Sequence, residues 1–355
     1  MVEYEMEQRK IMALGKSSLV ITLPKYWLEM NNLGQGDHVS LTVQHDLSLA
    51  VQPSSRAVED GGEIHLNFKA NESEDSIIRR IIGSYLNGYS NIKLTSEKIF
   101  TVRQQRAIRG VVSMLFMRIM ESEASSVVLQ TLIDESRASV FSGIERMHVI
   151  TSSMCRDTLN SMRNWDGDLA SSVVSLEDDV DQFMFFLLRL VRTAALRPSL
   201  ASQLGLDPLD CLDCQTLVHR IESVADHTTS IANNVISLIE SHVVIPGAVL
   251  GALMRAAEIA FGAYDMAVQS FLSKDVSHSN EIIDNQREIE ELRKKILSLQ
   301  ILSEYEDASV VYPISSIRES IEKIGDYAAD IAELTIDRTY KVGTSYGPPD
   351  KELAI

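Results

Sequence analysis

The sequence Arg220-Ile-Glu-Ser-Val-Ala-Asp-His227 returns one hundred positions later as Ser320-Ile-Glu-Lys-Ile-Gly-Asp-Tyr327. Both copies place a glutamate four residues before an aspartate, and Ile231 further along recurs as Ile331. In an α-helix, residues four positions apart lie on one face, about 40° from each other around the axis. The recurrence therefore predicts an internal repeat whose units are helical and about 100 residues long.

An earlier pair of acids repeats in the same way. Glu177 and Asp181 correspond to Asp284 and Glu288, at a spacing of 107 residues. The seven extra residues fit a longer loop in the first copy, between positions 197 and 210. The two spacings together indicate that at least two helices of each unit are duplicated.

The chain from about residue 136 to 337 has apolar residues every three or four positions, as in antiparallel helical bundles. We expect an all-α C-terminal body made of two three-helix-bundle repeats, at 145–240 and 247–337. Residues 338–355 contain two glycines and two prolines and are expected to form a flexible tail.

Paired carboxylates on neighbouring helices are a common way to bind metal ions in helical bundles. The spacing alone is weak evidence, because 32 acidic residues in 146–355 give about five such pairs by chance, and we count six. Four of the six fall at equivalent positions of the two repeats, which favours a common role, although a duplicated solvent-exposed acidic face is the alternative. The candidate metal ligands are Glu177, Asp181, Glu222, Asp226, Asp284, Glu288, Glu322 and Asp326.

Helical geometry predicts where these acids lie. With Ile221 at 0° on the core side, Glu222 falls near 100° and Asp226 near 140°. The carboxylates therefore flank the core, and we expect metal clusters on the surface of the bundle. Oxygen ligands of this kind suit magnesium, calcium, manganese and iron.

The segments 220–227 and 320–327, on duplicated three-helix units with Glu/Asp-x-x-x-Asp motifs, resemble the signature of the PhoU family of phosphate-uptake regulators. The resemblance implies a body that binds multinuclear clusters of metal ions of the iron, zinc or magnesium class. It also implies a phosphate ABC transporter or a sensor kinase as protein partner. The chain departs from the pattern at Asp284-x-x-x-Glu288, where the two acids are reversed, and at Ala225, where the family often has glycine.

The N-terminal stretch is rich in β-branched and turn residues. Residues 18–23 form a strand-like run before Pro24, residues 25–30 fit a short helix, and apolar residues alternate over 39–43 and 47–51. The segment Gly15-Lys-Ser-Ser-Leu-Val-Ile-Thr-Leu-Pro-Lys25, followed by Leu33-Gly-Gln-Gly-Asp37, resembles the AbrB/SpoVT swapped-hairpin domain, over about 7–52.

That resemblance implies a homodimer whose paired β-surface presents basic residues to promoter DNA. Arg9, Lys10, Lys16 and Lys25 are the candidate DNA contacts. Residues 1–55 nevertheless have a net charge of −2, so binding would have to be local and strongly salt-dependent. A head that only dimerises is the alternative. The head and the body together resemble archaeal PhoU-type regulators.

Between these parts, residues 62–135 read as a small α/β unit. We expect strands over 64–68, 91–95 and 127–132, and helices over 77–85 and 102–119. The protein as a whole is expected to be multidomain, with a small β-rich swapped-hairpin head, this middle unit and the helical body.

The composition excludes several classes of protein. The net charge of −17 and the 45% of hydrophobic residues exclude a disordered chain and a surface that binds nucleic acid throughout. Three cysteines cannot form a disulfide scaffold, so we expect a cytoplasmic protein, and no stretch is apolar enough to embed it in a membrane.

Motifs for enzyme chemistry are weak. Cys211-Leu-Asp-Cys214 lacks further zinc ligands, and Glu145-Arg-Met-His148 lacks the second copy that a diiron oxidase needs. No phosphate-binding loop, nucleophile elbow or dinucleotide fingerprint occurs. We therefore expect a non-enzymatic, DNA-binding regulator of phosphate uptake. A protein-only adaptor is the alternative, and a carboxylate-bridged metal oxidase is the least favoured.

Overall fold

The computed structural model describes residues 7–15, 18–43, 48–53, 61–242, 245–302 and 308–341. The chain divides into two compact units, residues 1–59 and residues 60–355, which are described separately below. Lys16 and residues 342–355 of the expected tail lie outside the described residues.

The head consists of two antiparallel hairpins and one short helix. Strands β1 (Met12–Leu14) and β2 (Ser18–Val20) form the first hairpin, α1 spans Lys25–Met30, and β3 (Val39–Val43) pairs with β4 (Leu49–Pro53). Among the described residues of this unit, only Pro53 is buried. The described residues of the head therefore form no core of their own, and an isolated two-stranded hairpin is at best marginally stable in water.

The middle unit is a four-stranded sheet covered on one face by two helices. Its elements are β5 (Glu63–Phe68), α2 (Glu74–Leu86), β6 (Asn91–Ser96), α3 (Val102–Met114), β7 (Met117–Ser122) and β8 (Ser126–Thr131). The strand order is β5-β6-β8-β7, with β5 parallel to β6 and the other pairs antiparallel. Alternate residues such as Ile92, Leu94 and Leu129 point into a core that α2 completes with Ile77 and Ile81.

One expected boundary in this unit is wrong. The sequence predicts a helix over 102–119, but α3 ends at Met114 and β7 begins at Met117. Phe116 between them has a positive φ of 50°, the left-handed conformation that reverses the chain after a helix. Pairing with β8 holds Met117 and Ile119 on the core side of the sheet, which overrides their compatibility with a helical pattern.

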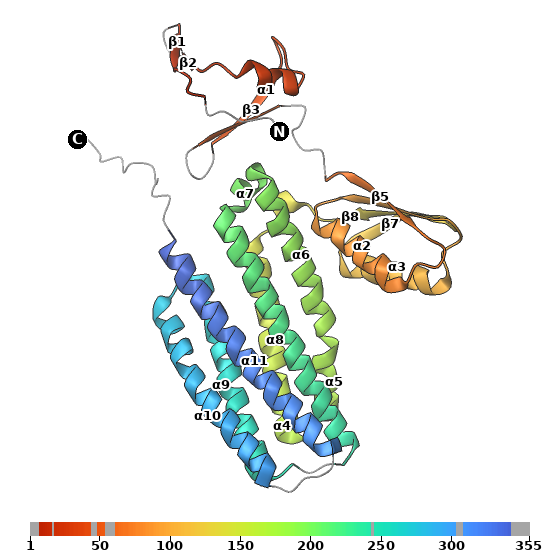
Figure 1. Ribbon diagram of the computed structural model, residues 1–355, viewed down its shortest axis with the longest axis vertical. Helices are drawn as coiled ribbons and strands as arrows, with labels where there is room; N and C mark the ends of the chain where they lie inside the picture. Colours follow the sequence, from red (N-terminus) through yellow and green to blue (C-terminus); the bar gives the residue numbers. More distant parts are fainter. Residues whose placement is uncertain are drawn as a thin grey trace, which may run out of the picture. The chain divides into compact units, whose positions relative to one another are not determined.

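The helical body has the two expected repeats (Figure 1). The first contains α4 (Val140–Asn164), α5 (Gly167–Ser175), α6 (Glu177–Leu196), α7 (Pro198–Leu204) and α8 (Pro208–Glu240). The second contains α9 (Gly247–Ser273), α10 (Val276–Leu302) and α11 (Ala308–Tyr340). The extra residues of the first copy form the short helix α7, in place of the expected loop.

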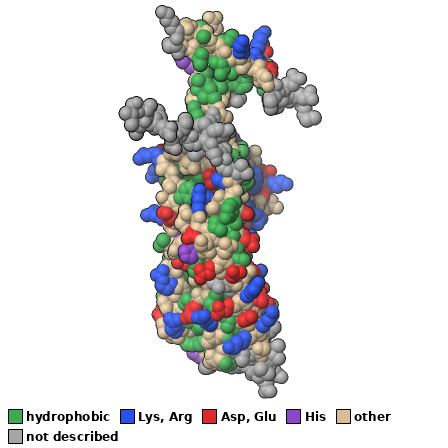
Figure 2. All heavy atoms as spheres, turned by 90° about the vertical axis from the view of Figure 1, so that its left-hand side faces the viewer, with side chains coloured by type: hydrophobic (Ala, Val, Ile, Leu, Met, Phe, Trp, Pro, Cys, Tyr) green, Lys and Arg blue, Asp and Glu red, His purple; other side chains and the backbone are tan. Residues whose placement is uncertain are grey.

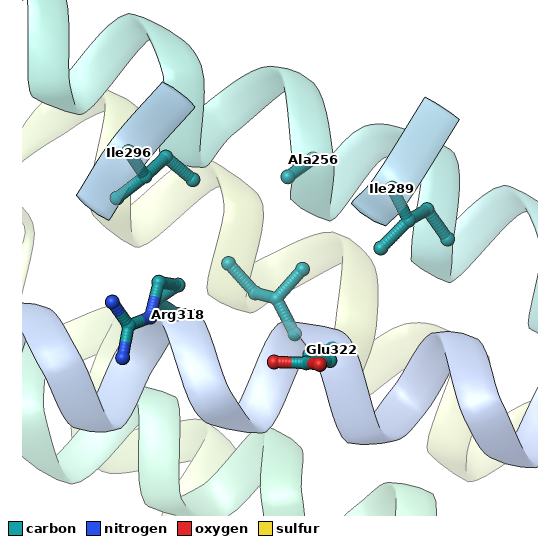
Figure 3. A pocket seen from close by; sticks show the side chains of 6 residues that line it. Ala256, Ile289, Ile296, Arg318 and Glu322 are labelled. Atoms are coloured by element: carbon teal, nitrogen blue, oxygen red, sulfur yellow. The ribbon is translucent and has the colours of Figure 1, made fainter. Parts of the chain in front are cut away.

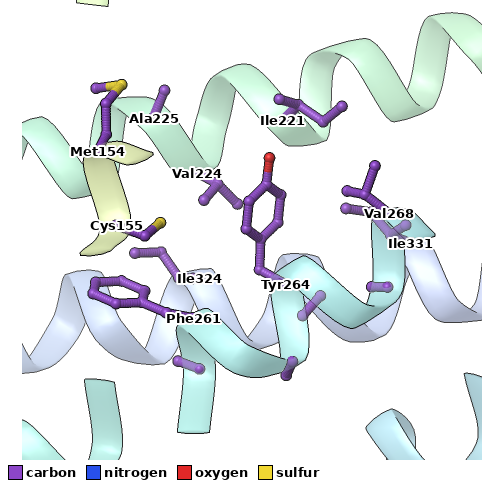
Figure 4. Packing of buried hydrophobic residues seen from close by; sticks show 14 of the residues in the cluster. Met154, Cys155, Ile221, Val224, Ala225, Phe261, Tyr264, Val268, Ile324 and Ile331 are labelled. Carbon is purple, nitrogen blue, oxygen red and sulfur yellow. The ribbon is translucent and has the colours of Figure 1, made fainter. Parts of the chain in front are cut away.

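The two repeats share one hydrophobic core, because α8 packs along α11 and α4 packs against α9. Figure 4 shows Cys155 of α4, Val224 of α8, Tyr264 of α9 and Ile331 of α11 converging in this core. The described residues contain no helix with the length and apolar character that a bilayer crossing requires.

The end of α11 reaches beyond the expected start of the tail at residue 338. Arg338 is buried and its Nη1 donates a hydrogen bond to the carbonyl of Phe271 at 3.0 Å. Lys341 donates to Asp207 and to Asp210 at the first turn of α8, each at 2.8 Å. These contacts fasten the end of the second repeat to the start of α8, so residues 338–341 belong to the folded body.

The middle unit is joined to the body through α6. Arg189, 1% exposed, donates to the carbonyls of Gly88 and Tyr89 at 3.1 and 3.0 Å and forms an ion pair with Glu135 at 2.7 Å. Gln182, two turns earlier, donates to the carbonyl of Ser113 at the end of α3 at 3.0 Å. Helix α6 therefore bonds to the end of α3 and to the turn after α2, and it packs against both of these helices.

Candidate metal centre

The first-repeat cluster, by which we mean Glu177, Asp181, Glu222 and Asp226, lies across the contact between α6 and α8. Glu177 opens α6, and the negative charges in that first turn are favourable at a helix N-terminus. Ile221 and Ala225 beside them on α8 are buried, whereas Glu222 is half-buried and Asp226 is exposed. The acids thus flank the core, in the arrangement that the helical geometry predicts.

The carboxylates of this cluster influence one another. Burial raises the pKa of Asp181 to about 6 and that of Glu222 to about 7, and in both cases the charge of Asp226 adds to the effect. Burial and the charge of Asp226 also raise the pKa of Glu177. Glu222 therefore keeps its proton to a higher pH than an isolated glutamate does. The four acids behave as one crowded group of negative charges.

Basic side chains do not relieve this crowding in the part of the chain that the structure describes. The only basic residue that affects the pKa of any of the four acids there is His227, which lowers that of Asp226. The donors are carboxylate oxygens, which are the ligands that hard cations prefer. The chemistry of the cluster thus fits a multivalent cation.

The second-repeat cluster, by which we mean Asp284, Glu288, Glu322 and Asp326, lies on α10 and α11. Arg255 of α9 donates from Nη2 to Glu288 Oε1 at 3.2 Å, and Lys323 Nζ donates to Asp326 Oδ2 at 3.1 Å. Figure 2 shows the face of the body on which α9, α10 and α11 lie in Figure 1, with acidic and basic side chains interspersed over it.

A small pocket opens beside the second-repeat cluster, between α9, α10 and α11 (Figure 3). Its lining residues are Ala256, Ile289, Ile296, Arg318, Ile321 and Glu322. Glu322 is the one carboxylate among them, so this hollow is not itself a cage of oxygen ligands.

The structure places the eight predicted ligands in these two clusters of four. In neither cluster are the carboxylates already arranged around a common point where a metal ion could bind. Among the described residues, no group of three or more His, Cys, Asp or Glu side chains lies close enough to hold a metal ion as the side chains stand. A metal would have to draw the carboxylates together, which the rotamers of exposed and half-buried acids allow.

The candidate DNA contacts in the head are partly paired with acids. Arg9 forms an ion pair with Glu7, and Lys25 Nζ lies 3.6 Å from Glu29 Oε1. Lys10 is exposed. The spacing of Lys25 and Glu29, four residues apart on α1, is the signal in the sequence for the second of these pairs.

The weaker motifs have structural explanations. Cys155, Cys211 and Cys214 are free and buried, and burial raises their pKa values to about 12, 11 and 12, which leaves unreactive thiols. His148 of the Glu-x-x-His motif is buried between α4 and α9, where its Nε2 lies 3.1 Å from Asp265 Oδ1. It belongs to neither carboxylate cluster.

The fold and the clusters define a helical body of duplicated three-helix units with paired surface carboxylates, which follows a small β-rich head in the sequence. The model of the PhoU domain matches residues 144–235 and again 253–335. The model described as "Antidote-toxin recognition MazE, bacterial antitoxin" matches residues 12–59. The chain therefore contains two PhoU domains that follow a MazE-type head, which confirms the predicted fold class.

Two solved structures are similar to the chain. PhoU from Pseudomonas aeruginosa is 22% identical, with a TM-score of 0.50, over 56% of this chain and 94% of that chain. The phosphate transport system regulatory protein PhoU from Streptococcus pneumoniae is 14% identical, with a TM-score of 0.48, over 56% of this chain and 92% of that chain. The first of these likenesses shows the fold of the body. A comparison with curated proteins gives no match.

Proposed function

We propose that this protein regulates phosphate transport as a non-enzymatic, DNA-binding dimer whose first repeat binds metal. The observation that carries the proposal is the presence of two PhoU domains and a MazE-type head in one chain. The head would bind promoter DNA, and the body would sense the state of the cell or contact a phosphate ABC transporter or a sensor kinase. Free cysteines suit a cytoplasmic location.

Dimerisation is supported by the apolar surface of the head. Many of its large apolar side chains are exposed, although they alternate along strands as core residues do. They include Ile11 at 64%, Leu14 at 63%, Leu19 at 74%, Leu41 at 60% and Val43 at 62%. A second copy of the head would cover these side chains and supply the core that one copy lacks.

DNA binding is supported by the MazE-type match and by the exposed Lys10. The ion pairs of Arg9 with Glu7 and of Lys25 with Glu29 favour the second candidate function, a protein-only adaptor whose head dimerises without binding DNA. The two candidates differ in charge chemistry: phosphate contacts release counterions, so DNA affinity falls steeply with salt.

Metal binding is proposed for the first-repeat cluster. Glu177 and Asp181 on α6 and Glu222 and Asp226 on α8 would hold the ion, since their donor atoms fit it and their charges are otherwise uncompensated in the described structure. A bound cation would neutralise the mutual repulsion of the carboxylates and link the two helices. Iron, zinc and magnesium are the classes of ion to test.

The experiment that tests the DNA-binding function is recovery of genomic fragments bound to the purified full-length protein, followed by a salt titration on the recovered duplex. Phosphate-transport promoters among the fragments, with affinity that falls with salt and on Lys10→Ala/Lys25→Ala, support the regulator. Lys98→Ala, at an exposed position of the middle unit, is the matched control and should leave affinity unchanged. No specific fragment, or no response to salt, supports the adaptor.

A further inference from the structure

The two repeats differ in the basic side chains that pair with their carboxylates. In the repeated motif, position 223 of the first copy is serine and the equivalent position 323 of the second copy is lysine. Lys323 therefore stands three residues before the second acid of its motif, within reach of it on the helix surface. Its Nζ donates to Asp326 Oδ2 at 3.1 Å.

A second cation approaches the same cluster from another helix. Arg255 of α9 donates from Nη2 to Glu288 Oε1 of α10 at 3.2 Å. One acid on each of the two helices that carry the second-repeat cluster is thus bonded to a basic side chain. A metal that used these carboxylates would have to displace an ammonium and a guanidinium group, and would bring two fixed positive charges close to itself.

The first-repeat cluster has no such counterions. Within the described ranges, none of its four acids forms an ion pair with lysine or arginine, and Ser223, at the position equivalent to Lys323, donates a neutral hydrogen bond to Glu222 at 3.4 Å. The same arrangement of acids is therefore left uncompensated in one repeat and neutralised by the protein's own side chains in the other.

We propose that only the first repeat takes metal and that Lys323 and Arg255 replace the cation in the second. This inference rests on the proposed metal binding of the first-repeat cluster. In the second repeat, Arg255 links α9 to α10 without metal, and Lys323 neutralises Asp326 within α11. Metal loading then changes only α6 and α8, of which α6 contacts the middle unit through Gln182 and Arg189.

The test is the metal content of the full-length protein after loading with Fe²⁺, Zn²⁺ or Mn²⁺ and removal of unbound ions. Glu222→Gln/Asp226→Asn should lose the bound metal, whereas Glu322→Gln/Asp326→Asn should retain the wild-type stoichiometry. Loss of part of the metal in the second variant would overturn the inference. Circular dichroism of each variant controls for folding.

A gain-of-function variant separates the inference from the proposed function. Lys323→Ser/Arg255→Gln removes the cations bonded to Asp326 and Glu288 and should raise the metal stoichiometry above that of the wild type. Wild-type protein without metal would contradict the proposed metal binding of the first repeat. Failure of Lys323→Ser/Arg255→Gln to gain metal would contradict the role assigned to the two cations.

Discussion

The rings of His227 and Tyr327, at equivalent positions of the two repeated motifs, lie 5.8 Å apart across the contact between α8 and α11. Each follows directly after the aspartate that ends its motif, so the two motifs meet at this contact between α8 and α11. Burial lowers the pKa of His227, and the positive charge of Lys323 in the other repeat lowers it further. The positive charge of Lys323, in the second repeat, therefore acts on a side chain of the first repeat.

The first prediction concerns this coupling. Lys323→Ser should raise the pKa of His227, because it removes a positive charge that disfavours the imidazolium. The ring proton signals of His227, followed by NMR as a function of pH in metal-free protein, measure the change. Lys274→Ser, at an exposed lysine at the end of α9, is the control and should leave the pKa of His227 unchanged. An unchanged pKa in Lys323→Ser would contradict the coupling.

The second prediction concerns the link between α6 and the middle unit. Arg189→Ala should destabilise the protein by about 3–5 kcal/mol, because it leaves Glu135 and the carbonyls of Gly88 and Tyr89 without their buried partner. Chemical denaturation measures the loss. Arg156→Ala, at an exposed position of α4, should change stability by no more than about 0.5 kcal/mol. Equal effects of the two variants would refute the role of Arg189.

The third prediction is a pH dependence of the metal-free protein. The folded pKa of Glu222, about 7, lies above its ordinary value, so the folded state binds more protons than the unfolded state between the two values. Stability is therefore highest at the acidic end of that range and falls as pH rises through about 7. Glu222→Gln should weaken this fall and should be more stable than the wild type at alkaline pH.

Thermal unfolding in the presence of a chelator, at several pH values, measures this difference between wild type and Glu222→Gln. The conservative control is Glu258→Gln, at an exposed glutamate of α9 outside both clusters. Parallel pH profiles for the wild type and Glu222→Gln would show that burial and the neighbouring carboxylates do not raise the pKa of Glu222 in the folded protein.

The fourth prediction concerns the head. Leu19→Lys should reduce dimerisation of the full-length protein, because Leu19 is 74% exposed in one copy and a charge there cannot be buried against a second copy. Sedimentation velocity over a range of protein concentrations measures the association. Val149→Lys, at an apolar residue of α4 that is 66% exposed, should leave it unchanged. A dimer that survives Leu19→Lys would place the interface elsewhere.

Much of the fold can be predicted from the sequence, because the patterns that define it lie within short segments of the chain. The repeated Ile-Glu-x-x-x-Asp motif predicts the duplication and places the acids beside the core, and Lys25–Met30 is helical as expected. The end of α3 cannot be predicted from the sequence, because the strand that begins at Met117 depends on pairing with β8. Such pairing is a tertiary contact that helical spacing cannot reveal.

Some features of the candidate site can likewise be predicted from the sequence, and others cannot. Lys323 is visible in the sequence as the substitution of serine by lysine within the repeated motif, and its effect could have been anticipated. Arg255 and Arg189 could not, because their partners Glu288 and Glu135 lie on other elements, 33 and 54 positions away. Counterions of this kind follow from packing, and only the structure shows which acids they neutralise.

The central claim, regulation of phosphate transport, is tested most directly in cells that lack this protein. Phosphate-transporter transcripts and phosphate uptake, measured under phosphate-replete and phosphate-starved conditions, should no longer follow the phosphate supply. Wild-type protein should restore the response, whereas the Leu19→Lys variant should not. Transcripts and uptake that follow phosphate supply equally well with and without the protein would contradict the account.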